Sequence, residues 1–464
     1  MAETQFAEGM TPLDLLMPGG YIGAVLVFPT TEPPSDLLTK FQNGLDLVCK
    51  RIPWLMGQVF QTSTAEGQKP SLEIRWTATD AAPRIVDKGT LSATYEELSQ
   101  VKVPLESIPS DMWPTPGQVQ AELGSGSGAP VFGANFFRFT NGKAVGLCVQ
   151  THHNSMDGFG FAEIINLWAQ FMSEPESQVP SFSFASERNT RLAKAIGQNP
   201  NTASLDELFE KHPEYSRIPP VLPTEFASCT SEILTISMKK IETYKESLKP
   251  HLETTPSTNT VACALLWSAI TRARMRRTPD LEHKTSRLPM AVNGRKRLDP
   301  SLADHQNPYL GNMVLFSTAE QPARSVCDCS TANSAVLLAD ICRAVAQAQS
   351  PERINGTHIR EVHHLAHEIN DHRTIFPGWE LFGSRDLFIT SWADLNFYEF
   401  EFGSGLGKPE FVRIPYAQAD GNVIILPRKR NVDGPVSSQV IEAVIMLQRQ
   451  DLDVLKEDSL WEKL

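Results

Sequence analysis

The chain has 464 residues, and its 42 Lys and Arg against 54 Asp and Glu give a formal net charge of −12. Its length predicts two or three domains, and its 41% hydrophobic and 21% charged residues exclude a disordered chain or a coiled coil. The acidic balance argues against a nucleic-acid binder, and no apolar run approaches the length of a membrane span.

The N-terminus and the cysteines are typical of a protein in a reducing compartment of the cell. The first residues, MAETQFAEGMTPLD, contain neither the basic nor the apolar region of a signal peptide. Seven cysteines, an odd number, fit a reducing environment better than a disulfide framework. We therefore expect a soluble, cytoplasmic and monomeric protein without a membrane or nucleic-acid partner.

Hydrophobic patterns predict the elements of the first half in turn. A strand is expected at 21–29, and a helix at 35–51 with Ser35 as its N-cap. Residues 52–55 should be extended, because proline disfavours helix in the residue before it. Further strands are expected at 72–77, 134–140 and 144–151, a flexible loop at 124–128, and a helix at 158–171.

A segment rich in Ser, Pro and Glu, residues 173–226, predicts a long crossover linker. Beyond it the strongest helix spans 257–276, capped by Ser257 or Thr258. A second helix is expected at 241–249, and strands at 233–237, 287–292, 313–316, 386–392, 421–426 and 440–446. The sequence therefore predicts an α/β fold of two similar-sized lobes, 1–172 and 227–464, with ligands bound where they meet.

The sharpest motif is HHNSMDG, residues 152–158, between an expected strand and an expected helix. HxxxD alone is uninformative, because about 0.5 matches arise by chance and His367–Asp371 is one, whereas HHxxxDG is expected about 0.001 times or less. A neutral imidazole at a strand end is suited to accept a proton from a hydroxyl or amine. Asp157 stands where a helix N-cap belongs, and Gly158 allows a tight turn, so we expect Asp157 to organise the site. The alternative is two buried core histidines beside an N-cap.

In this form the motif resembles that of the BAHD acyltransferases and their relatives in the chloramphenicol-acetyltransferase-like superfamily. Where the family has DFGWGKP, this chain has EFGSG, residues 401–405, and two further residues before Lys408, which is more similar to fungal toxin and alkaloid O-acetyltransferases. Other similar segments follow in family order: TPLD (11–14), IPWLMG (52–57), STNTVACALLW (257–267), NGRKR (293–297), YLGN (309–312) and TSW (390–392). The resemblance implies two lobes of that superfamily's fold, each a mixed sheet with flanking helices.

The resemblance also implies a reaction. An acyl group, which the resemblance to the O-acetyltransferase branch implies to be acetyl, would pass directly from acyl-CoA to a hydroxyl or amine of a small secondary metabolite, with His153 as general base. No permanent cofactor and no Ser or Cys nucleophile is implied. Thr390 and Trp392 would donate hydrogen bonds to the oxyanion, and Ser257 and Thr258 would lie at the coenzyme A pocket. For Trp392 the alternative is a core aromatic.

Arginines are expected in two roles. By resemblance, Asp157 pairs with an arginine, Arg295 first and Arg297 second. The segment 272–297 holds nine Lys and Arg and two Asp and Glu, a local charge of +7, so Arg295 and Arg297 are also candidates for gripping the phosphates of coenzyme A. For residues 272–277 the alternative is a solvated helix end.

Other kinds of site are not expected. His363, His364 and His367 have no carboxylate or cysteine at ligand spacing, so no metal is predicted. The absence of GxSxG disfavours a serine hydrolase. Two other functions stay open: a condensation-type enzyme that takes its acyl group from a carrier protein, and a non-catalytic binding protein of the same fold. The TSW and FGSG segments and the lack of a fused carrier domain favour the acyl-CoA-dependent enzyme.

Overall fold

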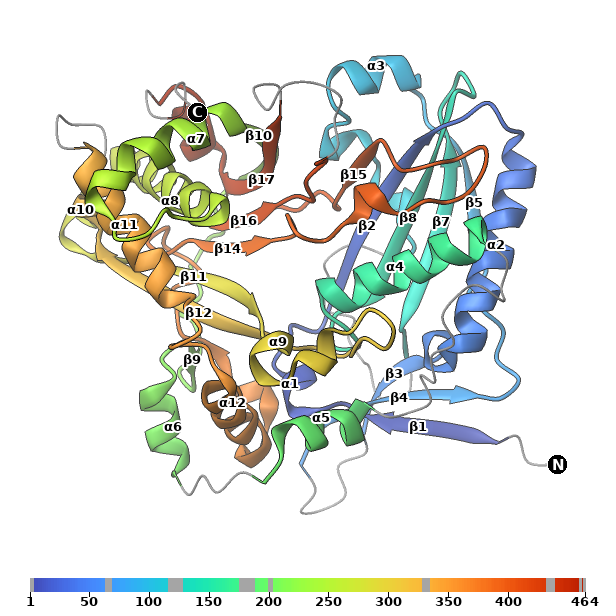
Figure 1. The fold of residues 1–464 in the computed structure, drawn as a ribbon, viewed down its shortest axis with the longest axis horizontal. Helices are drawn as coiled ribbons and strands as arrows, with labels where there is room; N and C mark the ends of the chain where they lie inside the picture. Colours follow the sequence, from blue (N-terminus) through green and yellow to red (C-terminus); the bar gives the residue numbers. More distant parts are fainter. Residues whose placement is uncertain are drawn as a thin grey trace.

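The computed structural model describes residues 4–62, 69–115, 128–174, 188–198, 203–327, 334–430, 439–458 and 461. Its two large sheets occupy the two halves of the molecule, and each has helices packed against it (Figure 1). The α/β fold of two mixed sheets with flanking helices, expected from the sequence, is confirmed.

The first sheet has five strands in the order β15-β2-β8-β7-β5. All neighbours are antiparallel except β5 and β7. Every residue of β8 is buried, as expected of a central strand with both faces covered. Its helices are α2 (Pro34–Arg51) and α4 (Gly158–Ser173), and its strands are β2 (Tyr21–Pro29), β5 (Val86–Thr90), β7 (Phe132–Arg138), β8 (Ala144–His152) and β15 (Phe411–Arg413). The edge strand β15 comes from the second half of the chain.

The second sheet has six strands in the order β10-β17-β16-β14-β11-β12, with β14 parallel to both of its neighbours. Its central helix α8 (Thr258–Arg277) is buried on all sides, because other helices enclose it against the sheet. These helices are α7 (Met238–Leu248), α10 (Ala323–Cys327), α11 (Ser334–Ala348) and α13 (Arg449–Lys456). The strands are β10 (Cys229–Ser237), β11 (Thr285–Asn293), β12 (Val314–Pro322), β14 (Phe388–Ser391), β16 (Asn422–Ile425) and β17 (Val440–Gln448).

Smaller elements complete the fold. A four-stranded sheet has the order β1-β4-β3-β6, and a two-stranded sheet joins β9 to β13. These strands are β1 (Gln5–Gly9), β3 (Gln58–Gln61), β4 (Leu72–Thr77), β6 (Ala129–Pro130), β9 (Tyr215–Ser216) and β13 (Phe376–Pro377). The remaining helices are α1 (Pro12–Leu15), α3 (Tyr95–Gln100), α5 (Arg188–Ile196), α6 (Leu205–Lys211), α9 (Arg295–Leu298) and α12 (Gly356–Glu368). Single turns of 3-10 helix occur between them, among them η1 (Pro53–Met56).

Two local predictions are wrong. Helix α2 begins at Pro34 with no side-chain cap, so Ser35 is not its N-cap; proline is well suited to the first helical turn, where no backbone donor is needed. Residues 53–56 form η1 rather than an extended stretch. Only Ile52, with φ −129° and ψ 73°, has the non-helical backbone expected before a proline.

The segment predicted as a linker contains structure of its own. Its described residues include α5, α6 and β9, and α5 lies in the lower part of the molecule beside β1 and α12 (Figure 1). Of the predicted flexible loop 124–128, all but Gly128 lies outside the described residues. Within the described chain, no helix is both long and apolar enough to cross a membrane.

Candidate active site

His153 follows the last residue of β8, and contacts of both its backbone N–H and its ring fix its position. Its N–H donates to the carbonyl of Gly20 at 2.7 Å. Its Nδ1 lies 3.3 Å from the carbonyl oxygen of Met156. A carbonyl only accepts, so Nδ1 carries the proton and Nε2 keeps its lone pair. Burial lowers the pKa of His153, against the opposing charge of Asp157, so the ring is neutral at neutral pH. This is the form that a general base requires.

His152 has a different environment. Its side chain is fully buried, with its ring edge-on to Tyr21 at 5.3 Å between centroids. Neither ring nitrogen has a hydrogen-bond partner among the described residues. Burial lowers its pKa to about 4, so His152 is an uncharged core residue. The expected alternative of a core histidine therefore describes His152 rather than His153.

Asp157 caps helix α4, as the motif predicted. Its Oδ1 accepts from the N–H of Gly160 at 3.0 Å, and its Oδ2 accepts from the N–H of Met313 at 2.9 Å. The carboxylate also forms a two-bond ion pair with Arg295, at 2.9 and 3.0 Å. With only 1% of its surface exposed, Asp157 joins α4 to the second half of the chain and fixes the loop that carries His153.

Arg295 has all five of its N–H donors engaged. Besides the two bonds to Asp157, it donates to the carbonyls of Tyr309 and Gly311 and to the side chain of Asn293. Its guanidinium is fully buried and lies 4.4 Å from the ring centre of Phe159. Of the two roles expected for Arg295, the structure shows the pair with Asp157, and no donor remains for a phosphate.

Three polar residues outside the histidine loop, 153–157, hold it in place: Asp14, Arg188 and Asn312. Asn312 donates to the carbonyls of His153 and Asn154 and to Asp14. Asn154 donates to the carbonyls of Asp14 and Met17. Arg188 donates to the carbonyl of Ser155 at 2.5 Å and pairs with Asp14 at 3.3 Å.

The sequence carried a partial signal for these supports. Asp14 and Asn312 lie in the TPLD and YLGN segments, to which sequence reasoning gave no role. Arg188 lies in the predicted linker, at the start of α5, where no local pattern marks it. The loop is thus held by residues from three separate parts of the chain.

Trp392 and Gly158 are adjacent across the two halves. A Cβ placed on Gly158 would lie 3.2 Å from Nε1 of Trp392 and 3.3 Å from Leu395. Gly158 does not have a positive φ angle, so close packing, and not the tight turn we expected, accounts for its missing side chain. Trp392 is 8% exposed and stacks on Phe397. Trp392 is therefore a buried aromatic residue, as the alternative expected, and its indole nitrogen also faces the start of α4.

Thr390 and the expected coenzyme A residues lie on the second sheet and its central helix. Thr390 is half-buried on β14, opposite Ile424 of β16. Ser257 is the N-cap of α8, with Oγ accepting from the N–H of Thr260 at 3.0 Å. Thr258 accepts from Nζ of Lys245 at 2.7 Å. Ser257 is exposed and Thr258 half-buried.

The remaining expected coenzyme A residue, Arg297, binds backbone instead. Its guanidinium donates to the carbonyls of Gln349, Ser350 and Ile354, which follow helix α11. Burial lowers its pKa. Arg297 therefore anchors the end of α11 to α9.

Most of the basic segment 272–297 is paired with acidic residues. The ion pairs are Arg272 and Arg276 with Asp458, Arg274 with Asp420, Arg277 with Asp451, Arg287 with Glu320 and Arg295 with Asp157. Arg274 is only 2% exposed, whereas the side chain of Arg276 is 55% exposed, so the solvated surface offered as an alternative describes only part of this helix end. The arginines of α8 join this helix to the rest of the second half, and Arg295 joins the second half to Asp157 of the first, roles that the local sequence does not show.

The EFGSG loop is a structural support. Gly403, Gly405 and Gly407 all have positive φ angles, which side chains other than glycine adopt poorly. The carbonyl of Gly405 accepts from the hydroxyl of Thr30 at 2.7 Å. Phe402 packs edge-on against Phe28 of β2 at 4.9 Å. This loop therefore attaches the second half of the chain to the first sheet.

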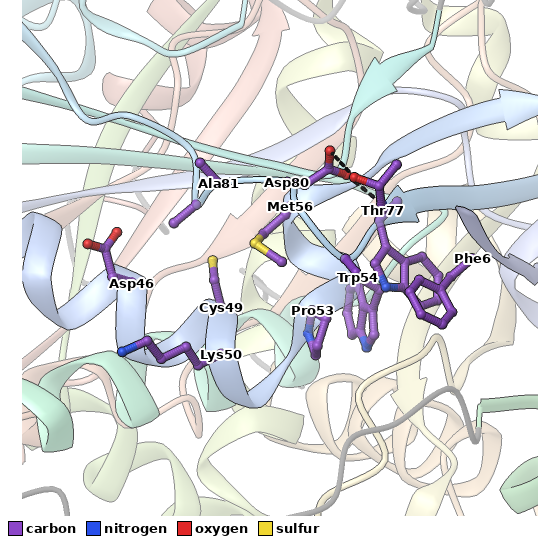
Figure 2. Close-up of a pocket in the computed structure, with 13 residues that line it drawn as sticks. Phe6, Asp46, Cys49, Lys50, Pro53, Trp54, Met56, Thr77, Asp80 and Ala81 are labelled. Atoms are coloured by element: carbon purple, nitrogen blue, oxygen red, sulfur yellow. Dashed lines mark hydrogen bonds between the residues drawn. The ribbon is translucent and has the colours of Figure 1, made fainter. Parts of the chain in front are cut away.

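A separate pocket of about 660 Å³ opens between α2, η1 and β4 (Figure 2). Trp54 and Trp76 are among the residues that line it, and none of the expected site residues does. Burial raises the pKa of the Cys49 thiol in this pocket to about 12, so it is not a thiolate nucleophile. The Trp54 ring also lies 5.0 Å from the guanidinium of Arg188, which links this wall to the support of the histidine loop.

Comparisons with known proteins agree over the whole length. The model of the Transferase family matches residues 117–460, and that of a trichothecene 3-O-acetyltransferase-like N-terminal domain matches residues 21–171. The chain is 28% identical to trichothecene 8-O-acetyltransferase of Fusarium sporotrichioides, covering 97% of this chain and 96% of that protein. It is 27% identical to eremophilane O-acetyltransferase ORF8 of Penicillium roqueforti, covering 93% and 94%.

Solved structures show the same fold. TRI101 of F. sporotrichioides, complexed with coenzyme A and T-2, matches with a TM-score of 0.80 and 20% identity over 99% of this chain and 98% of that one. Vinorine synthase matches with a TM-score of 0.65 and 16% identity, covering 96% and 91%.

Proposed function

The chain belongs to the Transferase family, and from this premise we propose that it transfers an acetyl group from acetyl-CoA to a hydroxyl group of a small secondary metabolite. The resemblance expected from the sequence is thereby confirmed at the level of the family. The observation that carries the proposed activity is the state of His153: neutral, with Nδ1 engaged by the Met156 carbonyl and Nε2 left to accept a proton.

The proposed reaction is a direct transfer in which His153 moves one proton. Nε2 accepts the proton of the acceptor hydroxyl as its oxygen attacks the thioester carbonyl. The new C–O bond forms, the C–S bond breaks, and the imidazolium returns the proton to the departing thiolate of coenzyme A. No acyl-enzyme forms. Asp157 acts as a positioning residue, because its oxygens are occupied by Arg295, Gly160 and Met313.

The negative charge on the carbonyl oxygen requires donors in place before the reaction. We propose the hydroxyl of Thr390 and the indole N–H of Trp392 for this role. Their support is positional: Trp392 lies against the first residue of α4, immediately after Asp157. Donors from β14 would thus meet a base from β8 where the two halves adjoin, and the acceptor and donor would bind between them.

For the donor we propose Ser257 and Thr258 at the N-terminus of α8. Exposed N–H groups at a helix start favour phosphate, and a charged Lys245 contacts Thr258. Arg295 and Arg297 support the site without contacting coenzyme A: Arg295 holds Asp157, and Arg297 holds the end of α11. We propose two lobes, 1–172 and 227–464, with strand β15 of the second lobe added to the sheet of the first.

The names of the relatives favour a hydroxylated trichothecene or eremophilane as acceptor. We further propose a monomeric, cytoplasmic enzyme that binds no nucleic acid and no membrane; a net charge of −12 disfavours a nucleic-acid partner.

The test is an assay of free thiol release with acetyl-CoA and a panel of such acceptors, with product mass measured alongside. Acetylated product that depends on free acetyl-CoA supports the proposal. Product formed only from an acetyl group on a carrier-protein arm would identify the condensation-type enzyme instead. Binding of acceptors without turnover of either donor would identify a binding protein.

A further inference from the structure

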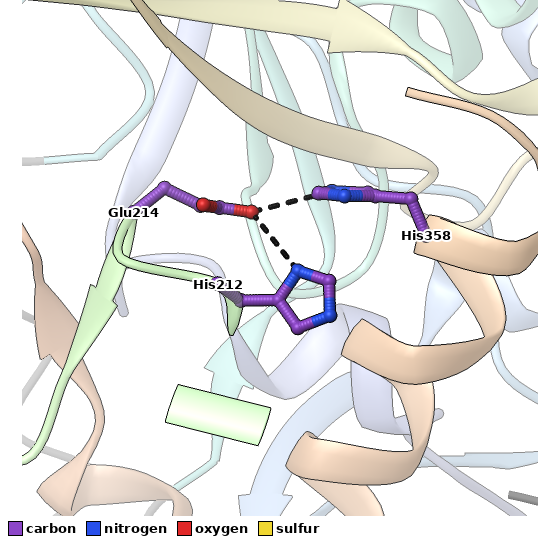
Figure 3. Close-up of side chains that lie close together, drawn as sticks. All are labelled: His212, Glu214 and His358. Atoms are coloured by element: carbon purple, nitrogen blue, oxygen red, sulfur yellow. Dashed lines mark ion pairs between the residues drawn. The ribbon is translucent and has the colours of Figure 1, made fainter. Parts of the chain in front are cut away.

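A second group of histidines lies away from the candidate active site, where the crossover segment contacts helix α12. Figure 3 shows His212, Glu214 and His358 directed toward a common point. His212 directly follows α6, Glu214 directly precedes β9, and His358 stands in the first turn of α12. None of them belongs to a motif used for the acyltransferase.

Three polar atoms in this cluster are buried without hydrogen bonds. They are Nδ1 of His212, Oε1 of Glu214 and Nε2 of His358, none of which has a partner of suitable geometry in the described chain. His212 is 1% exposed and Glu214 6%. Leaving a carboxylate oxygen and two ring nitrogens buried and unsatisfied is costly, so the arrangement calls for a group that binds all three.

The spacing of the three atoms fits one metal ion. Oε1 of Glu214 lies 3.5 Å from Nδ1 of His212 and 3.3 Å from Nε2 of His358. Bonds of about 2.0–2.1 Å in a tetrahedral zinc site place ligand atoms about 3.4 Å apart. All three atoms lie within 4.8 Å of one another, so small side-chain movements complete the geometry.

The surroundings of His212 fix it in the state that a metal needs. Its Nε2 lies 3.1 Å from a carboxylate oxygen of Glu361. A carboxylate accepts the Nε2–H and leaves the lone pair on Nδ1, as in the carboxylate–histidine–zinc arrangement. Glu361 is in turn paired with Lys211 at 2.5 Å. In the described part of the chain, the carboxylate of Glu214 forms ion pairs only with these two imidazoles and with no lysine or arginine.

The backbone that carries the cluster is also fixed. β9 pairs with β13, and the N–H of Gly378 donates to the carbonyl of Glu214 at 3.0 Å. A Cβ on Gly378 would come within 1.8 Å of the carbonyl oxygen of Pro213, so the backbone segments at Pro213 and Gly378 are in close contact. His358 is held by the side chain of Asn355, which accepts from its N–H. The three ligands are therefore positioned before any ion binds.

We propose that His212, Glu214 and His358 form a binding site for a divalent transition-metal ion of the zinc type. Two imidazoles and one carboxylate are the ligand set that zinc accepts, with water as the fourth ligand. The bound ion joins α6 and β9 of the crossover segment to α12. The site is independent of the proposed acetyl transfer.

The test uses the full chain, freed of any affinity tag and of metal by a chelator. Titration with Zn²⁺ should show one ion bound per chain and a melting temperature that rises with zinc and falls again with chelator. Glu361→Gln should weaken zinc binding about 10-fold to 100-fold, because the Glu361 carboxylate orients the ring of His212. Glu214→Gln and His358→Gln should weaken it further. His363→Gln, on the same helix but outside the cluster, should bind zinc like the parent chain.

Cobalt gives a second measurement that needs no variant. Co²⁺ bound to the parent chain should show the visible absorption of a four-coordinate ion, and Zn²⁺ should abolish it. The proposal is overturned if the metal-free chain binds no equivalent of either ion. It is also overturned if Glu214→Gln binds zinc as tightly as the parent, or if zinc binding disappears equally in His363→Gln. In the first case the three side chains form a closed His–Glu–His polar network.

Discussion

The histidine loop and the basic segment 272–297 both stand out in the sequence, yet the structure uses them differently. In the histidine loop the backbone carbonyl of His153, its Nδ1 and the carboxylate of Asp157 are all engaged, and Nε2 of His153 is left for chemistry. In the basic segment, charge that suggested a phosphate site is paired with carboxylates. The fixed spacing of the motif thus predicted which side chain is left available for chemistry. The local excess of charge did not predict whether the arginines are free to bind a phosphate.

Arg295 belongs to both regions and explains the difference. It lies within the basic segment, but its donors are consumed by Asp157 and by backbone carbonyls. A buried arginine without its carboxylate would be strongly unfavourable. The charge of Arg295 is therefore needed to hold the histidine loop. The following changes test the histidine loop and the basic segment in turn.

The largest effect is expected from His153→Ala. A positioned general base contributes about 100-fold to 10,000-fold, so kcat should fall by that factor, while the melting temperature and coenzyme A binding stay close to those of the parent. Turnover and thermal unfolding of the same preparation check this. Retention of more than about a tenth of the activity would remove His153 from the role of base.

Breaking the pair between Asp157 and Arg295 should act on stability first. Removing one partner of a buried ion pair costs about 3–5 kcal/mol, so Asp157→Ala and Arg295→Ala should both unfold at much lower denaturant concentrations. The double variant should lose less than the sum of the two, because it leaves no unpaired charge. An inactive Asp157→Ala that unfolds like the parent would instead assign Asp157 a part in the chemistry.

The burial of His152 should make the stability of the protein depend on pH. An unfolded histidine titrates near 6.5, whereas burial lowers the pKa of folded His152 to about 4. Its contribution to stability is therefore complete above about pH 6.5 and decreases as the pH falls toward 4, by up to about 1.4 kcal/mol per pH unit. The free energy of unfolding, measured with denaturant between pH 4 and 7, should change less with pH in His152→Gln than in the parent. An unchanged slope would mean that His152 is not a buried neutral group.

The smallest functional effect is expected from Arg297→Ala. Its bonds to backbone carbonyls predict a loss of about 1–2 kcal/mol of stability and a change below about threefold in the KM for acetyl-CoA. Initial rates at varied donor, compared with those at varied acceptor, measure this. An increase of about 10-fold or more confined to the donor would return Arg297 to the coenzyme A site.

Much of the fold was predictable because its strands and helices carry clear periodicity. The strand 21–29 and the burial of α8 follow directly from apolar patterns. The N-cap at Asp157 and its pairing with Arg295 were predictable from the motif and the resemblance. Errors occurred at prolines, where Pro34 and Pro53 begin helical turns that their neighbours did not indicate.

The rest depends on contacts between distant residues. Arg188 supports the loop from a segment that reads as a linker, and Asp458 neutralises arginines far away in the sequence. His212 and Glu214 meet His358 only because β9 and α12 pack together. Spacing along a helix, which is how the sequence was searched for metal ligands, cannot reveal such a set.

The most direct test of the central claim, that neutral His153 is the general base, is the pH dependence of kcat/KM in the parent enzyme. Because burial lowers the pKa of His153, the rate should be constant around neutral pH and fall on the acid side through a single pKa below 6.5. A profile that rises through a pKa above 6.5, or one that stays flat down to pH 4, would contradict the account.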